Sequence, residues 1–361
     1  MKRTWELVKR LRESGGAKTS TLGASINSDA GPQLLPQNKA NAFGEFLKKS
    51  FTESDENRLT EDEWSGWEER HCDTLPTQPT LRSVSKETRE LLASPITKEE
   101  IVEAIKALKP GKAISVDHLC AEVLALDPEG WAEWLLPVIG DMDKSTQEGR
   151  VIFLYKGKGS TSDRSNYRPI SILSPMYKIW TTIITKRCNV MVDDIASSWQ
   201  FGFRRNRGCR EALYSVQALI SRSAHPDLSM AMLDLSKAFD KANRKILLRK
   251  MIEYGAPKSF VDSIRRGHEN TRLTACFEGK YSEPVDIQKG VYQGSPLSPV
   301  LYVIYAHSIF LDFQEEAEKR GLSQVKLTNE PVASNGLLEL GENQRPKDGD
   351  EKIPMVCYAD D

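Results

Sequence analysis

Helical spacing of apolar residues is clearest in residues 94–113. Ile101 and Ile105 fall on one face of this stretch, as expected for a helix that packs against a core. Thr97 is the predicted N-cap, and Glu100 follows three residues later, which is the capping-box arrangement. The Pro-Gly pair near the end of the stretch is expected to stop the helix.

Shorter patterns predict the other elements. Helices are predicted for residues 1–14, 38–51, a segment that begins near residue 113, 243–255 and 297–313. Residues 151–159 predict a strand that runs into a basic glycine turn, and 229–239 predict a second strand. Residues 271–291 predict a hairpin that turns near Glu278–Gly279. Residues 15–37 are rich in Gly, Ser, Pro and Asn, so we predict a loop or linker there.

Charge is distributed unevenly along the chain. The composition, 39% hydrophobic and 28% charged, is ordinary for a soluble globular protein, and the length of 361 residues suggests two or three domains. The net charge of −1 hides a basic middle, because residues 150–210 hold twelve Lys and Arg against three Asp. Residues 53–73 hold nine acidic residues against two Arg. A basic face is typical of proteins that bind polyanions, although a solvated face explains the charge equally well.

The cysteines and the apolar stretches exclude some classes of protein. The six cysteines form no CxxC pair and show no zinc-ligand spacing, which fits a reducing compartment. The first 14 residues carry two glutamates and lack the apolar core of a signal peptide. The most apolar stretch, residues 296–311, is too short and too polar for a membrane span, so we expect no membrane partner.

Three aspartates stand where a carboxylate is costly. Asp360 and Asp361 follow the apolar run 355–358, and Asp234 lies inside a predicted apolar strand. A lone acid in such a strand is more often a satisfied core group than a catalyst. If the two strands are neighbours in one sheet, the three carboxylates converge as two Mg²⁺ ions require for phosphoryl transfer.

Two basic stretches suit phosphate and nucleic acid. Residues 155–171 place Lys and Arg among glycines and small residues, which suits a triphosphate, although the Walker A spacing is absent. Residues 200–213 interleave arginines with Phe201 and Phe203, a combination that suits a nucleic-acid strand. Both phenylalanines are equally well explained as core residues.

One further stretch, residues 289–302, has special backbone chemistry. Gly294 allows close backbone approach, and Pro296 and Pro299 fix the entrance to the following helix. Taken alone, these residues indicate no more than a rigid helix start.

The motifs gain specificity from their order. They are "LYKGKG" (154–159), "NYRPISILS" (166–174), "QFGFRRNRG" (200–208), "MLDLSKAFD" (232–240), "GVYQGSPLSPVL" (290–301) and "YADD" (358–361). In this order they resemble the reverse transcriptase of non-LTR (LINE-type) retrotransposons, from about Glu99 to the end of the chain. Residues 108–124 are similar to the opening segment of that family, with Ser115 where the family usually has glycine.

The resemblance implies an α+β fold of the right-hand polymerase type. We expect a mostly helical, partly disordered N-terminal extension or linker in residues 1–95, and the fingers with the start of the reverse transcriptase domain in 96–228. Residues 229–361 are expected to form an incomplete palm with a polar insertion at about 324–352. The second strand of the YADD hairpin and a thumb are not expected within the chain.

The resemblance also implies site residues by position. The expected catalytic acids are Asp234, Asp360 and Asp361, of which Asp234 and Asp360 are the principal ligands of two Mg²⁺ ions, with Mn²⁺ as a substitute. The residues expected to bind the nucleotide are Lys156, Lys158, Arg168, Phe239, Gln293 and Gly294. Phe239 is expected to be the gate that rejects a 2′-hydroxyl. The residues expected near the template are Arg204, Arg205 and Arg207.

The implied function is RNA-directed DNA polymerisation. The expected partners are an RNA template, a DNA primer or nicked target DNA, and dNTPs, with a nuclear or nuclear and cytoplasmic location. An endonuclease and the thumb are expected in the same longer reading frame, so residues 1–361 alone are expected to show weak or no activity. The alternatives are a catalytically dead RNA-binding relic and an intron-type or domesticated reverse transcriptase. Phe239 and "QGSPLSP" disfavour a viral RNA-dependent RNA polymerase.

Overall fold

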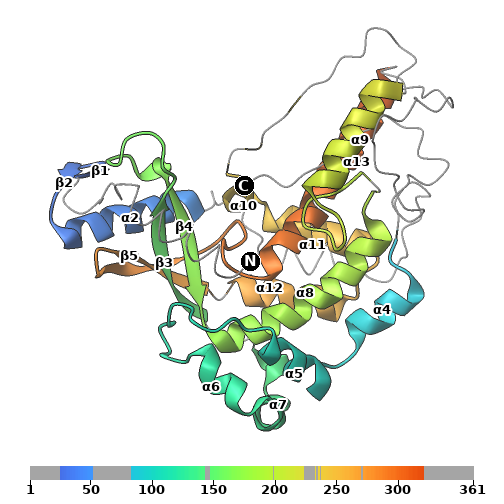
Figure 1. Ribbon diagram of the computed structural model, residues 1–361, viewed down its shortest axis with the longest axis horizontal. Helices are drawn as coiled ribbons and strands as arrows, with labels where there is room; N and C mark the ends of the chain where they lie inside the picture. Colours follow the sequence, from blue (N-terminus) through green and yellow to red (C-terminus); the bar gives the residue numbers. More distant parts are fainter. Residues whose placement is uncertain are drawn as a thin grey trace, which may run out of the picture.

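A computed structural model shows how these patterns fold. It describes residues 25–51, 83–142, 147–197, 199–222, 232, 235, 237–269 and 271–320. Within them, a four-stranded mixed sheet lies beside a group of helices, and buried residues from both parts form one hydrophobic core (Figure 1). The predicted α+β class is therefore confirmed.

The larger sheet joins two hairpins that are far apart in the sequence. Its strands are β3 (Gln147–Tyr155), β4 (Tyr167–Leu173), β5 (Thr271–Phe277) and β6 (Lys280–Asp286). In the order β4-β3-β5-β6, the outer pairs are antiparallel and the central β3–β5 pair is parallel. The predicted strand and hairpin are confirmed, and Glu278 (φ +48°) and Gly279 (φ +74°) form the turn. Two successive positive φ angles match the right-handed twist of a hairpin.

The segment before the first long helix differs from its prediction. The expected loop at residues 15–37 contains a short hairpin, β1 (Ile26–Ser28) with β2 (Gly31–Gln33), whose register pairs the two strands directly. Strands of three residues are too short to show an alternating pattern. Two contacts stabilise the hairpin. The Ile26 side chain is buried, and the Asn27 amide donates a hydrogen bond to the Ser162 carbonyl at 2.9 Å.

The helix α2 (Pro36–Phe51), predicted at residues 38–51, packs on β5 and β6. Phe43 is fully buried, and its ring stacks on that of Phe153 with centroids 4.1 Å apart. Gly44 allows the close approach, since a Cβ there would lie 2.7 Å from the Cβ of Ser282. A residue of the expected N-terminal extension thus lies in the centre of the sheet's core, where burying a Phe side chain contributes about 1.5–3 kcal/mol.

The remaining helices lie to the right of the sheet and below it in Figure 1. They are α4 (Lys86–Ala93), α5 (Lys98–Lys106), α6 (Ala121–Leu126), α7 (Pro128–Leu135), α8 (Pro175–Ile195), α9 (Cys209–Arg222), α10 (Ala238–Lys241), α11 (Arg244–Glu253), α12 (Lys258–Glu269) and α13 (Leu297–Lys319), with a short 3-10 turn at Ile139–Asp141. A second 3-10 turn, Arg164–Asn166, lies in the connection between β3 and β4. The predicted helices at 243–255 and 297–313 are confirmed, as is helix after residue 113. The predicted helix at residues 1–14 and the insertion at 324–352 lie outside the described residues.

The capping box of α5 is present as predicted. The Thr97 side chain accepts from the Glu100 amide at 3.3 Å, and the Glu100 carboxylate accepts from the Thr97 amide at 3.0 Å. The helix ends at Lys106, ahead of the Pro-Gly pair predicted to stop it. The Leu108 amide donates to the Ile105 carbonyl at 3.0 Å, so a tighter turn closes the helix early.

Helix α8 lies at the centre of the helical part and contacts α4, α5 and α13. Its residue Arg187 has a side chain only 4% exposed. Arg187 donates to both carboxylate oxygens of Glu100 and to the carbonyl oxygens of Ser94 and Pro95, at 2.6–2.9 Å. Burial alone would raise the pKa of Glu100, but the hydrogen bonds from Arg187 and Thr97 outweigh it and lower that pKa. This cluster fastens the α4–α5 loop to α8.

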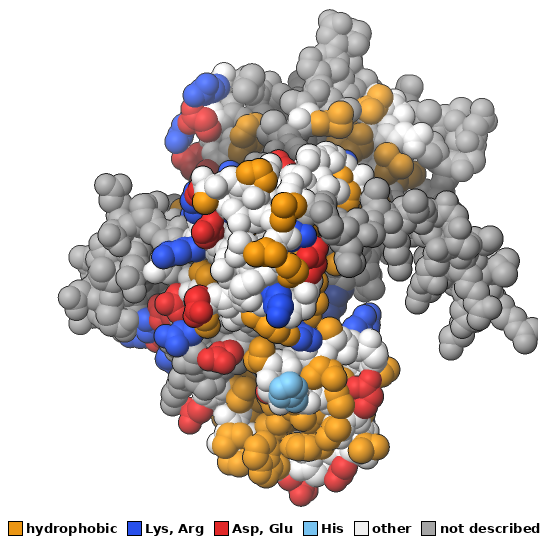
Figure 2. All heavy atoms as spheres, turned by 90° about the vertical axis from the view of Figure 1, so that its left-hand side faces the viewer, with side chains coloured by type: hydrophobic (Ala, Val, Ile, Leu, Met, Phe, Trp, Pro, Cys, Tyr) orange, Lys and Arg blue, Asp and Glu red, His pale blue; other side chains and the backbone are white. Residues whose placement is uncertain are grey.

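Apolar side chains gather at the lower end of the molecule, over α6 and α7 (Figure 2). The large exposed ones in this part of the chain are Ile114, Val116, Val123, Leu126, Trp134, Leu136 and Val138. Among the described residues, no helix is long and apolar enough to cross a membrane.

Candidate active site

Helix α10 is joined through backbone hydrogen bonds to the loop that precedes α13, residues 287–296, called the Gln293 loop below. The Val291 amide donates to the Phe239 carbonyl at 2.9 Å, and the Gly290 amide donates to the Ala242 carbonyl at 3.0 Å. Gly290 has a φ of +74°, and a Cβ there would lie 2.7 Å from a carbonyl oxygen of α10. Glycine is therefore required for this contact. Two of the motif stretches found in the sequence thus lie against each other.

The end of the predicted strand at residues 229–239 is corrected by the structure. Ala238 and Phe239 belong to α10, and Lys237 before them has a left-handed φ of +56°. A left-handed residue does not fit a β-strand, so no strand can run through Lys237 to residue 239. Most of the remaining predicted strand lies outside the described residues.

Aromatic rings hold Phe239 from two sides. Its ring stacks on that of Tyr302 on α13, with centroids 5.1 Å apart and planes 19° from parallel. Phe203 approaches edge-on, with centroids 5.9 Å apart. Both geometries are favourable for aromatic pairs. The Phe239 side chain is half-buried, so part of this well-held ring remains accessible.

Gln293 is fixed at its backbone and at its side chain. Its carbonyl oxygen accepts from the Ser171 amide on β4 at 2.7 Å, and its side-chain Nε2 donates to Oδ1 of Asp240 at 3.0 Å. The next residue, Gly294, has a φ of +115°, and a Cβ there would lie 2.5 Å from the Ser171 carbonyl oxygen. The loop is therefore held between the sheet and α10.

Arg244, the first residue of α11, holds the same loop through several hydrogen bonds. The guanidinium donates hydrogen bonds of 2.9–3.4 Å to the carbonyl oxygens of Ile287, Lys289, Gly290 and His268 and to the hydroxyl of Tyr292. It also lies over the Tyr292 ring, 5.5 Å from the centroid. A single side chain thus collects acceptors from both the loop and the end of α12, an arrangement that a planar, multidentate donor can make.

The basic turn after β3 lies at the surface. Lys156 and Lys158 are exposed, and Gly157 (φ +76°) and Gly159 (φ +80°) shape the turn. The Lys156 ammonium donates to the Ser165 carbonyl at 2.9 Å. Arg168 on β4 is exposed as well, opposite Leu154 in the strand register. These three cations, predicted for the nucleotide, lie on one hairpin.

Asp240 links α10 to the loop through its hydrogen bond with Gln293. Burial raises the pKa of its carboxyl, while the hydrogen bond from Gln293 and the charges of Lys237 and Lys156 act against the shift. Gln293 therefore contacts this carboxylate directly, and the charge of Lys156, another predicted nucleotide-binding residue, acts on it. Lys237 and Asp240 were not singled out from the sequence, although both lie within the quoted stretch 232–240.

A ring from α2 supports the cations at this site. The Lys237 ammonium lies 5.2 Å from the centroid of Phe46, and the Arg164 guanidinium lies 6.0 Å from the same centroid. Such contacts contribute about 0.5–1 kcal/mol at exposed positions. The N-terminal helix thus contributes a side chain to the neighbourhood of α10.

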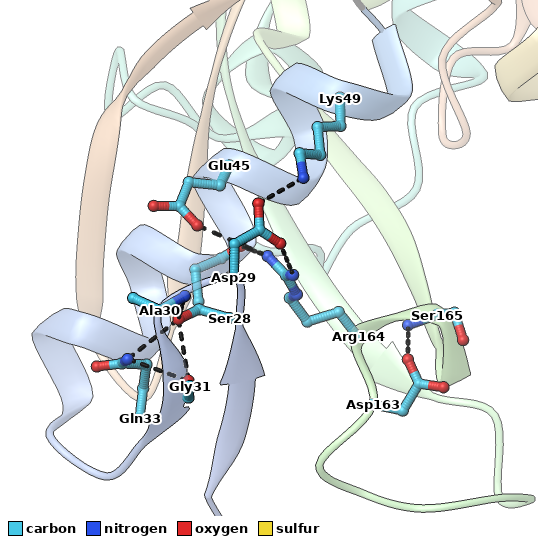
Figure 3. Close-up of polar contacts among 11 residues, drawn as sticks. Ser28, Asp29, Ala30, Gly31, Gln33, Glu45, Lys49, Asp163, Arg164 and Ser165 are labelled. Atoms are coloured by element: carbon cyan, nitrogen blue, oxygen red, sulfur yellow. Dashed lines mark hydrogen bonds and ion pairs between the residues drawn. The ribbon is translucent and has the colours of Figure 1, made fainter.

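Arg164 is held in place by α2 and the β1–β2 turn (Figure 3). It donates to the Ala42 carbonyl at 2.7 Å and pairs with Asp29 at 3.3 Å and with Glu45 at 3.8 Å. Lys49 also donates to Asp29, and this hydrogen bond is the main reason that the pKa of Asp29 is lowered. These pairs tie the 3-10 turn that follows Lys158 to the N-terminal part.

The predicted template residues differ in their surroundings. Arg204 donates to the Ser197 carbonyl at 2.9 Å and to Asp193 at 3.3 Å, and its side chain is 8% exposed. Arg207 lies 5.6 Å from the Phe201 centroid, and burial together with the charge of Arg204 lowers its pKa. Arg205 is exposed. Of the three guanidinium groups, that of Arg205 is the most available to a partner.

The predicted catalytic acids Asp234, Asp360 and Asp361 lie outside the described residues. Within the described part of the chain, no group of three or more His, Cys, Asp or Glu residues is placed to hold a metal ion. The metal site therefore stays a prediction.

The geometry agrees with a match to a known family. Residues 156–361 match the family described as "Reverse transcriptase (RNA-dependent DNA polymerase)". This range contains α10, the Gln293 loop and the basic turn after β3.

Several retrotransposon proteins are similar to this chain. The probable RNA-directed DNA polymerase from transposon BS of Drosophila melanogaster is 28% identical over 74% of the chain and 29% of its own length. The RNA-directed DNA polymerase from mobile element jockey of Drosophila funebris is 30% identical over 60% of the chain and 24% of its own length. The Pol polyprotein of element R2DM of Drosophila melanogaster is 32% identical over 45% of the chain and 15% of its own length. The chain thus spans less than a third of the length of these relatives.

Proposed function

The chain belongs to the reverse transcriptase family and carries the RNA-directed DNA polymerase domain of a non-LTR retrotransposon; from this premise we propose that it forms the fingers and palm of that polymerase. The β3–β4 hairpin and the helices before it correspond to the fingers, and α10, the Gln293 loop and α13 correspond to the palm. The substrates are dNTPs and a DNA primer annealed to an RNA template. The proposed location is nuclear, or nuclear and cytoplasmic.

The proposal rests on one observation: the helix that carries Phe239 is hydrogen-bonded to the loop that carries Gln293. Backbone hydrogen bonds place α10 against the Gln293 loop, and the charge of Lys156 acts on the Asp240 carboxylate that Gln293 contacts. A gate residue, a polar nucleotide contact and a phosphate-binding cation are needed at one place for nucleotide selection. Phe239 and Gln293 stand on elements that are joined through their backbones, which supports these two roles, and Lys156 is the proposed cation.

Each side chain has a distinct part in the proposed reaction. Lys156, Lys158 and Arg168 attract and orient the triphosphate through charge-assisted hydrogen bonds. Phe239, held by Tyr302, occupies the space that a 2′-hydroxyl would need. Gln293 and Gly294 line the position of the nucleotide and template. Arg205, with Arg204 and Arg207 beside it, contacts the template backbone.

The proposed metal ligands are Asp234 and Asp360, with Asp361 as the third catalytic acid. Carboxylate oxygens are the donors that Mg²⁺ prefers, so the donor set fits two such ions, and Mn²⁺ has similar preferences. Ions held by these carboxylates would supply the positive charge that phosphoryl transfer needs at the attacking 3′-hydroxyl oxygen and at the leaving pyrophosphate. The described side chains position the nucleotide for that attack.

Primer extension tests the proposal. The protein made from the complete natural reading frame that contains this chain is expected to extend an annealed DNA primer on RNA in Mg²⁺. Asp234→Ala should abolish extension while leaving template binding intact. Template binding without extension by the unsubstituted protein would contradict the proposal and favour the RNA-binding relic.

A further inference from the structure

Asp240 has no role in the expectations above, yet it is a buried acid that contacts a proposed nucleotide-binding residue, Gln293. It directly follows Phe239, and only 7% of its surface is exposed. A buried carboxylate costs several kcal/mol unless it is partnered. Its Oδ1 accepts a hydrogen bond from the side chain of Gln293, so the acid directly contacts a residue of the proposed nucleotide site.

We propose that Asp240 is a positioning residue that fixes the orientation of the Gln293 carboxamide for the incoming deoxynucleotide. The inference rests on the proposed function. The two ends of a carboxamide are nearly equal in shape but opposite in hydrogen bonding, because the nitrogen donates and the oxygen accepts. An ionised carboxylate only accepts, so it holds the Gln293 nitrogen inward and leaves the oxygen free to accept from the nucleotide.

Backbone hydrogen bonds fix the position of the Gln293 main chain. The Ser171 amide fixes the Gln293 carbonyl at 2.7 Å, and the Gly290 and Val291 amides fix the loop on α10. Both partners of the Asp240–Gln293 hydrogen bond therefore stand on a rigid frame. The remaining freedom is in the Gln293 side chain, and the 3.0 Å contact to Asp240 restricts it.

The charges around Asp240 favour the form that only accepts. Lys237 at the N-cap of α10 and Lys156 at the end of β3 both act on the carboxyl as positive charges. Burial acts in the opposite direction and raises the pKa of Asp240. Replacing the acid by the isosteric amide should thus remove a buried charge without creating a cavity. A purely structural role predicts the reverse, a loss of stability on substitution.

A double-mutant cycle tests the inference. Asp240→Asn, Gln293→Ala and the double variant are made in the complete natural reading frame. Affinity for a labelled dNTP is measured in Mg²⁺ on an RNA template with a 3′-dideoxy-terminated DNA primer, which prevents chemistry. Because an asparagine side chain can present either end of its amide to Gln293, Asp240→Asn should weaken dNTP binding about 2- to 12-fold, the equivalent of roughly 0.5–1.5 kcal/mol for one hydrogen bond. In the Gln293→Ala background the same change should have almost no effect.

Two controls separate positioning from general effects. Asp286→Asn is a matched acid-to-amide change at an exposed pair with Arg272 on the sheet, and it should leave dNTP affinity unchanged. The melting temperature of Asp240→Asn at pH 7 should equal or exceed that of the unsubstituted protein.

The outcomes are distinct. An equal loss of affinity in both backgrounds, no loss in either, or a loss that follows a fall in melting temperature would overturn the positioning role. If the unsubstituted protein on primer–template binds no dNTP, the proposed function fails, and the inference fails with it.

Discussion

Arg187 and Arg244 fasten two different regions of the molecule by similar means. Each guanidinium donates to carbonyl oxygens of a loop that is distant in the sequence: Arg187 to the α4–α5 loop, and Arg244 to the Gln293 loop. Arg187 also pairs with the Glu100 carboxylate. Within the described part of the chain, Arg244 bonds to carbonyl and hydroxyl oxygens only, so its positive charge is not neutralised by a carboxylate there.

The difference shows what each region is suited to. At Arg187 the positive charge is paired with the Glu100 carboxylate, which favours stability. Around the Gln293 loop, the cations Arg244, Lys237 and Lys156 stand against the buried carboxylate of Asp240, and an excess of positive charge suits a phosphate ligand. His268 adds no charge at neutral pH, because burial, together with the charge of Arg244, lowers its pKa to about 3. Substitutions in the two regions should therefore affect different properties.

The largest effect on stability is expected for Arg187→Ala. Removal of the arginine leaves Glu100 and two carbonyl oxygens without their donor, and breaking a buried pair costs about 3–5 kcal/mol. The cost should lie toward the lower end, since Glu100 is partly exposed and can be rehydrated. Urea unfolding measures it, and dNTP affinity of the folded protein should not change. A lowered dNTP affinity would contradict the separation of the two regions.

Arg244→Ala should lower both stability and dNTP affinity. The loop that carries Gln293 loses its common donor, and hydrogen bonds to a charged group contribute roughly 1.5–3 kcal/mol each. Titration of dNTP onto the protein with primer–template measures the change, which should be about 10- to 150-fold if one such bond's worth is transmitted to binding. Arg244→Lys is the matched control and should restore only part of the affinity, because an ammonium cannot reach all the acceptors. Full affinity in Arg244→Ala would show that the loop holds its shape without this residue.

Several features of this site were predictable from sequence because they are local. Gly294 was expected to allow close approach, and the Glu278–Gly279 turn and the α5 capping box follow from neighbouring residues. Phe239 and Gln293 were found through motif order. The physical chemistry of short segments was enough for these predictions.

The role of Arg244 could not be predicted, because its partners are 24 to 48 residues away along the chain. An arginine at the start of an amphipathic helix has the same local pattern whether it faces water or a loop. The helix α2 was predicted too, but its packing against β5 and β6 depends on residues far along the sequence. Such contacts depend on which distant segments pair with each other, and the local patterns of a single sequence do not reveal that pairing.

The next effect in size concerns selectivity alone. Phe239→Val in the complete protein should raise ribonucleotide use relative to deoxynucleotide use by roughly 10-fold or more, the scale for removing apolar bulk from a pocket. Competitive incorporation measures the ratio of the two kcat/KM values. Tyr302→Phe keeps the stacked ring beside Phe239 and should leave the ratio unchanged. An unchanged ratio in Phe239→Val would remove Phe239 from the gate role.

The smallest effect is on pH dependence, and it has opposite signs in the two regions. Hydrogen bonds outweigh burial at Glu100 and lower its pKa, so its contribution to stability is present above the ordinary pKa of 4.5 and is lost as pH falls through the folded value. Burial dominates at Asp240 and raises its pKa, so the folded state binds the proton more tightly than the unfolded chain. Its contribution to stability therefore falls as pH rises from 3.8 through the folded value.

This contrast can be measured from free energies of unfolding between about pH 3 and pH 7. The variants are Glu100→Gln and Asp240→Asn, and each is compared with the unsubstituted protein. Glu100→Gln should become relatively less stable as pH rises, and Asp240→Asn relatively more stable. The subtraction removes titrations that all three proteins share. Differences of the same sign would contradict the contrast, because both acids would then be held by their partners in the same way.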